Sequence, residues 1–91
     1  MVIRPISAGA VSGADTISLD QNVFGGFVLS TDGTNAGTVT IRDSDGSGTI
    51  LAQVTSVQSL ALIQPIRADS GTVHYTISGT GASAMLYEWV Q

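Results

Sequence analysis

The chain has 91 residues, no cysteine, a net charge of −4 and only 11% charged residues. This length accommodates one domain, and the lack of cysteine excludes disulfides and thiolate metal sites. Lysine is absent and the three arginines are isolated, so nucleic-acid binding is not expected, and the longest apolar run, residues 60–63, is far too short to span a membrane.

Residues 1–15 are expected to form an N-terminal arm and a flexible linker in front of a β domain at residues 16–91. Residues 2–6 are a strand candidate, whereas residues 7–15 have the Ser, Gly and Ala content of a flexible linker. Such a linker would let the arm reach another chain and join it as an added strand. The candidate interface residues in the arm are therefore Val2, Ile3, Arg4 and Ile6.

Apolar and polar residues alternate with period two along the rest of the chain, as in half-buried strands. In the two clearest strands, 38–42 and 72–77, the residues expected to face inward are Val39, Ile41, Val73, Tyr75 and Ile77. Further strand candidates are residues 16–19, 23–30, 49–55 and 59–67. Turns rich in Gly and Asp separate these segments, a spacing typical of a β-sandwich or a small barrel. We predict an all-β fold, a single jelly-roll-like β-sandwich of about eight strands.

Two local features modify these strands. Gly25 and Gly26 interrupt residues 23–29, and because a strand follows them, not a helix, they indicate a β-bulge and not a phosphate-binding loop. Pro65 lacks a backbone N–H, so it is expected at a sheet edge, at a bulge or at a break between two strands.

The last segment, residues 83–90, has apolar residues at both alternating sets of positions. We expect Met85, Tyr87 and Trp89 to face inward, which leaves Leu86, Glu88 and Val90 facing outward. Two of those three outward residues are apolar, which indicates a strand covered on both faces or one that faces a partner. Leu86, Glu88 and Val90 are therefore candidate interface residues as well.

Residues that could carry chemistry are few. His74, the only histidine, lies in an alternating strand and is expected to face outward, not to act as a general base. Residues 43–48 resemble the start of a calcium loop, but the glutamate such a loop needs near position 54 is Val54, so a hairpin turn is favoured. We expect no catalytic residues, no metal site and no cofactor.

Self-association is expected from the composition. The core of a 91-residue chain is small, the surface is mostly neutral, and no lysine protects the sheet edges against pairing. We therefore expect a homo-oligomer in which neighbouring subunits cover these edges.

Four segments carry a resemblance to a known group: residues 27–29, residues 37–43 followed by a Ser/Gly turn, residues 49–51, and residues 72–75. Together they resemble the small β-sandwich virion proteins of tailed bacteriophages. The resemblance implies a capsid decoration, or cement, protein: a jelly-roll-like subunit, commonly a trimer, that binds the major capsid protein on the outside of the head. It implies a virion location after synthesis in the host cytoplasm, which agrees with the lack of a signal-peptide pattern at the start of the sequence.

Two other functions remain open. The five aromatic residues, Phe24, Phe27, Tyr75, Tyr87 and Trp89, are expected in the core, but aromatics on an exposed face would indicate a carbohydrate- or receptor-binding module of a phage fibre or tail. A non-viral, adhesin-like extracellular β-domain is the third possibility, which a secretion signal in the full gene would favour.

Overall fold

The structure is a computed structural model that describes residues 2–6 and 9–91. Within these residues the chain forms strands and no helix. The strands are β1 (Val2–Pro5), β2 (Gly13–Ser18), β3 (Val23–Ser30), β4 (Gly37–Asp43), β5 (Ile50–Ser56), β6 (Leu60–Arg67), β7 (Thr72–Ser78) and β8 (Ser83–Val90). Met1 of the expected arm, and Ser7 and Ala8 of the expected linker, lie outside the described residues.

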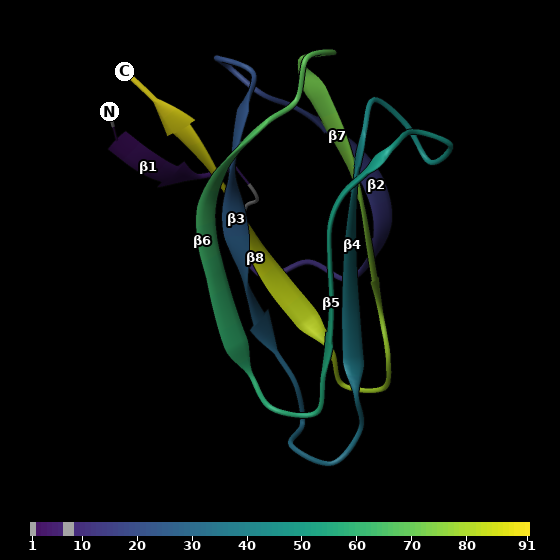
Figure 1. Cartoon of the computed structure of the whole chain (residues 1–91). Coiled ribbons are helices and arrows are strands. Elements are labelled where there is room, and N and C mark those ends of the chain that lie inside the picture. The colour runs from purple at the N-terminus through teal and green to yellow at the C-terminus, as the bar shows by residue number, and fades with distance from the viewer. Residues whose placement is uncertain (1, 7–8) are drawn as a thin grey trace.

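Two four-stranded antiparallel sheets pack face to face as a β-sandwich (Figure 1). The strand order is β1-β8-β3-β6 in one sheet, named sheet A, and β2-β7-β4-β5 in the other, named sheet B. Strands β1 to β4 thus pair in turn with β8, β7, β6 and β5, as in one long hairpin wrapped over itself. This is the order of a jelly roll, so the predicted jelly-roll-like β-sandwich is confirmed.

The core lies between the sheets and consists of alternate residues of the inner strands. Val39 and Ile41 of β4 and Val73, Tyr75 and Ile77 of β7 are all buried. The inward faces predicted for these two strands are therefore confirmed. The largest fully buried side chains are Phe24, Phe27, Leu29, Ile41, Leu86, Val39 and Val73.

The face of β8 that packs against the core is the opposite of the predicted one. Leu86, Glu88 and Val90, expected to face outward, are buried, and the side chains between them face outward. Leu86 lies directly opposite Phe27 of β3, and directly opposite residues of antiparallel strands share a face. Glu88 can face inward because Arg4 of β1 pairs with its carboxylate. The prediction was wrong because it assigned the aromatic residues of an ambiguous strand to the core.

Gly25 and Gly26 form the predicted bulge in β3, where the pairing with β6 shifts between Phe24 and Gly26. Gly26 has φ of +103°, and a Cβ atom at this position would collide with the carbonyl oxygen of Leu62 on β6. Pro65 lies on the edge strand β6, in the stretch opposite this bulge. Its predicted position at an edge or a bulge is confirmed, and the bulge lets β3 and β6 approach closely.

The connection between β4 and β5 is a hairpin turn. The N–H of Asp43 donates to the carbonyl oxygen of Thr49 at 2.8 Å, and the N–H of Gly48 donates to that of Asp45 at 3.0 Å. The Asp and Gly residues of this segment thus form the turn that the sequence favours.

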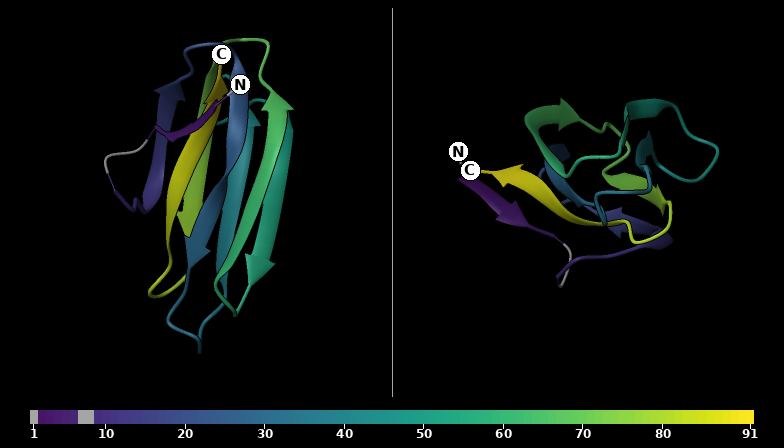
Figure 2. Two further views of the ribbon diagram at one scale, coloured as in Figure 1. Left: turned by 90° about the vertical axis from the view of Figure 1, so that its left-hand side faces the viewer. Right: turned by 90° about the horizontal axis from the view of Figure 1, so that it is seen from below.

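Between β1 and β2, Ile6 and Val11 lie along β8. The N–H of Ile6 donates to the carbonyl oxygen of Leu86 at 2.9 Å, and Val11 forms a β-bridge with Ala84. The side chains of Ile6 and Val11 both pack against the core. Strand β1 and the end of β8 lie side by side, so the two ends of the chain are neighbours (Figure 2).

Candidate interaction surface

The outer side of sheet A is apolar. Residues directly opposite each other share a face, so Ile3 and Trp89, Pro5 and Tyr87, and Val28 and Met85 form cross-strand rows that point away from the core. Together these rows and their neighbours on β3 and β6 form a surface that we name the outer apolar face. It consists of Ile3, Pro5, Val23, Val28, Ala61, Ile63, Met85, Tyr87 and Trp89.

The outer apolar face is open to solvent to different degrees. Ile63 is 48% exposed, Pro5 and Ala61 are exposed, and Tyr87 and Trp89 are half-buried. None of its nine residues is charged. The nearest charged side chain on this side is Arg67, which lies opposite Val23 and is paired with Asp69 at 2.7 Å. A continuous apolar face of this kind is typical of a surface that binds a partner.

The outer side of sheet B is polar instead. The hydroxyls of Thr38 and Thr55 lie 2.9 Å apart, and Gln53 Nε2 donates to Thr40 Oγ1 at 2.9 Å. His74 faces outward on this side, as predicted, and is half-buried. Its Nδ1 lies 3.0 Å from Thr16 Oγ1. The molecule is therefore two-sided, with an apolar outer face on one sheet and a hydroxyl-rich face on the other.

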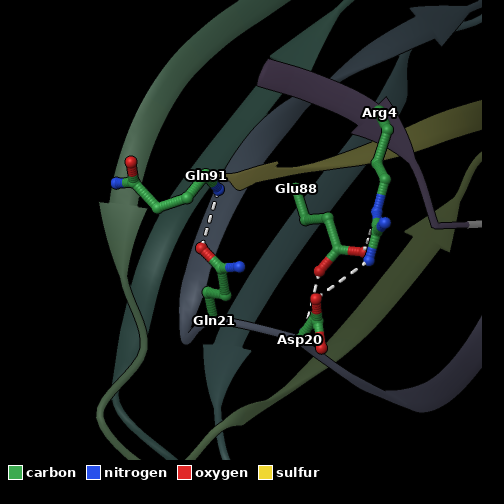
Figure 3. A network of polar contacts seen from close by, with 5 residues as sticks. All are labelled: Arg4, Asp20, Gln21, Glu88 and Gln91. Carbon is green, nitrogen blue, oxygen red and sulfur yellow. Dashed lines mark hydrogen bonds and ion pairs between the residues drawn. The ribbon is translucent and has the colours of Figure 1, made fainter. Parts of the chain in front are cut away.

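An ion-pair network holds β1 in place beside the outer apolar face (Figure 3). Arg4 Nε lies 3.0 Å from Glu88 Oε2, and Arg4 Nη2 lies 3.2 Å from Asp20 Oδ2. The backbone N–H of Asp20 donates to Glu88 Oε1 at 2.9 Å. Only 7% of the Glu88 side chain is exposed, and these partners offset the cost of burying its carboxylate. The network fixes the two strands that carry Ile3 and Trp89.

A second contact in Figure 3 holds the end of the chain. The backbone N–H of Gln91 donates to Gln21 Oε1 at 2.8 Å. Gln91, which follows β8, is thus tied to the turn that precedes β3, next to the Glu88 network.

The candidate interface residues predicted from the sequence lie in β1, directly after it at Ile6, and in β8, but they do not share one face. Val2 is 58% exposed, Ile3 belongs to the outer apolar face, and Arg4 points inward to Glu88. Ile6 packs against the core, and Leu86 and Val90 are buried. The residues missed by sequence reasoning are Met85, Tyr87 and Trp89, together with their neighbours on β3 and β6. The available signal was the apolar character of both faces of β8.

In the part of the chain that the structure describes, there is no cavity and no group of side chains suited to hold a metal ion. No helix in that part is long and apolar enough to cross a membrane. Comparison with protein-family models, curated proteins and solved structures finds no match.

Proposed function

We propose that this chain is a structural binding protein that docks onto another protein through its outer apolar face. Following the resemblance in its sequence, we propose a capsid decoration protein on the outside of a bacteriophage head, where its partner is the major capsid protein. The subunits would act there as a homo-oligomer. The observation that carries the proposal is the outer apolar face of sheet A, whose nine residues carry no charge.

Two features support this role. Burying apolar surface against a partner is the main favourable contribution to most protein association, and the nine residues of the outer apolar face offer such surface on rigid strands. The opposite side of the sandwich carries hydroxyl and amide groups of Thr38, Thr40, Gln53 and Thr55 instead. A subunit that binds a capsid needs this polarity, with one side for the shell and the other for solvent.

The test is binding to heads that lack the protein, measured by co-sedimentation. Ile63→Glu places a charge on the outer apolar face, and since the side chain is already 48% exposed, the core should be unaffected. Ser18→Glu is the matched control on the exposed outer side of sheet B. We expect the unmodified chain and Ser18→Glu to bind and Ile63→Glu to bind at least about tenfold more weakly, equivalent to 1.4 kcal/mol. Failure of the unmodified chain to bind would refute the capsid role.

A carbohydrate- or receptor-binding role is the second candidate, and the position of two aromatic residues favours it. Tyr87 and Trp89 lie on the outer apolar face, two residues apart on one strand, as in an aromatic platform for a sugar. Against it, the indole Nε1 of Trp89 is buried and has no hydrogen-bond partner among the described residues, so it is not available to a sugar hydroxyl. Trp89 is the only tryptophan. A glycan titration followed by its fluorescence therefore tests this role directly, and Tyr87→Ala should abolish any response.

A further inference from the structure

The sandwich has four edge strands, β1 and β6 in sheet A and β2 and β5 in sheet B. An edge strand presents a row of unpaired backbone N–H and C=O groups that can accept a strand from another chain. Proteins prevent such pairing with charged side chains, prolines or bulges on the edge.

Three of the four edge strands carry these protective residues. Strand β1 has Arg4 and Pro5, β2 has Asp15, and β6 has Pro65 and Arg67. Strand β5, Ile50–Ser56, has neither a charged residue nor a proline, and its pairing with β4 is irregular only near its start, opposite Ile41 and Arg42. Residues 52–56 of β5 are therefore the unprotected edge of the molecule.

The geometry of β5 suits strand addition. It pairs with β4 over its whole length, with one irregularity between Ile41 and Arg42 of β4, and residues 52–56 form its regular part. Ala52 and Val54 pack against the core, whereas Gln53 and Thr55 are exposed. In the left view of Figure 2, β5 and β6 form one margin of the molecule.

We propose that two copies of the chain pair through β5, antiparallel about a two-fold axis, and thereby join two copies of sheet B into one eight-stranded sheet. The strand that pairs with β5 is β5 of a second copy. In a two-fold antiparallel pair, a charged side chain on one β5 would lie close to the same charged side chain on the other β5, and this repulsion would oppose pairing. Strand β5 is the edge strand without a charged residue.

The register follows from the irregularity at the start of β5. A pair centred on Val54 uses only residues 52–56, and it places Val54 opposite Val54 and Gln53 opposite Thr55. Inward residues then meet inward residues, which keeps one face of the joined sheet apolar. The β-branched valine pair also favours strand pairing.

Sedimentation velocity of the full chain over a concentration series tests the pairing. The double variant Gln53→Lys/Thr55→Lys places lysines opposite lysines, and Gln53→Glu/Thr55→Glu places glutamates opposite glutamates. We expect the unmodified chain to dimerise and each variant alone to associate at least about tenfold more weakly, equivalent to 1.4 kcal/mol. An equimolar mixture of the two variants should dimerise again, because opposite charges then face each other.

The matched control is Ala14→Lys/Ser18→Lys, which adds the same two charges to exposed positions of β2, the other edge of the same sheet. It should dimerise like the unmodified chain. The proposal is overturned if the unmodified chain is monomeric at millimolar concentration, if the lysine variant associates as well as the unmodified chain, or if the mixture fails to dimerise. The proposal of β5 pairing rests only on the edge of sheet B, so failure of the chain to bind capsids would not affect it. A trimer whose assembly is insensitive to charges on β5 would refute it.

Discussion

Replacing Gly26 with alanine should destabilise the fold more than the backbone conformation alone explains. Gly26 has φ of +103°, where an L-residue is strained by about 1–2 kcal/mol. The added Cβ would also collide with the carbonyl oxygen of Leu62, so β3 and β6 must separate locally. Losing about two ladder hydrogen bonds costs roughly another 2 kcal/mol. The total is about 3–4 kcal/mol, a large part of the roughly 5–14 kcal/mol expected for a chain of this length.

Gly33→Ala separates the two contributions. Gly33 also has positive φ, at +82°, but a Cβ there would meet nothing within 4 Å. This variant should lose only the conformational part, about 1–2 kcal/mol. Urea unfolding followed by Trp89 fluorescence measures both variants. Equal losses in Gly26→Ala and Gly33→Ala would refute the claim that the close approach of β6 requires glycine in the bulge.

Four further substitutions test the remaining contacts. Leu86→Ala should lower the free energy of unfolding in urea by about 2–5 kcal/mol, and Tyr87→Ala by less than about 2 kcal/mol, because only Leu86 is fully buried. A larger loss for Tyr87→Ala than for Leu86→Ala would contradict the observed face of β8. Arg4→Met should lower the free energy of unfolding by about 1–2 kcal/mol in the same assay, because it leaves Glu88 with fewer partners. The loss stays modest because Arg4 is half-exposed and its charge is screened by solvent. An unchanged urea midpoint would show that the ion pair adds no stability. The pKa of Asp32 is lowered chiefly because its carboxylate accepts the N–H of Asn35, so its contribution to stability is full above about pH 5 and is lost as pH falls below about 4. The difference in melting temperature between the unmodified chain and Asp32→Ala should shrink over that range, and a difference that grows on acidification would contradict it.

The strands could be predicted wherever one face was apolar and the other was polar. Val39 and Ile41 alternate with threonines, so only one face of β4 could be buried. The same reasoning identified β7, and the chemistry of Gly26 and Pro65 identified the bulge and the edge. These features depend on neighbours in the sequence, and local patterns are sufficient to reveal them.

The face of β8 could not be predicted in the same way because both of its faces are apolar. Its orientation depends on pairing with Phe27 and on Arg4, which lies 84 positions from Glu88 in the sequence. A charged residue faces inward only if such a distant partner is available, and one sequence does not reveal that partner. The outer apolar face was missed for this reason, since its central residues lie on β8.

The wrapped-hairpin order of the strands also sets the order in which the fold can assemble. Pairing β4 with β5 requires closure of one short turn, whereas pairing β1 with β8 requires closure of almost the whole chain. The entropy lost on loop closure grows with loop length, and long-range contacts slow folding. We therefore expect folding to proceed from the β4–β5 turn outward through β3–β6 and β2–β7, with β1 pairing last. Of the eight strands, β1 is thus the first in the sequence and the last expected to pair, after the core between the sheets has formed.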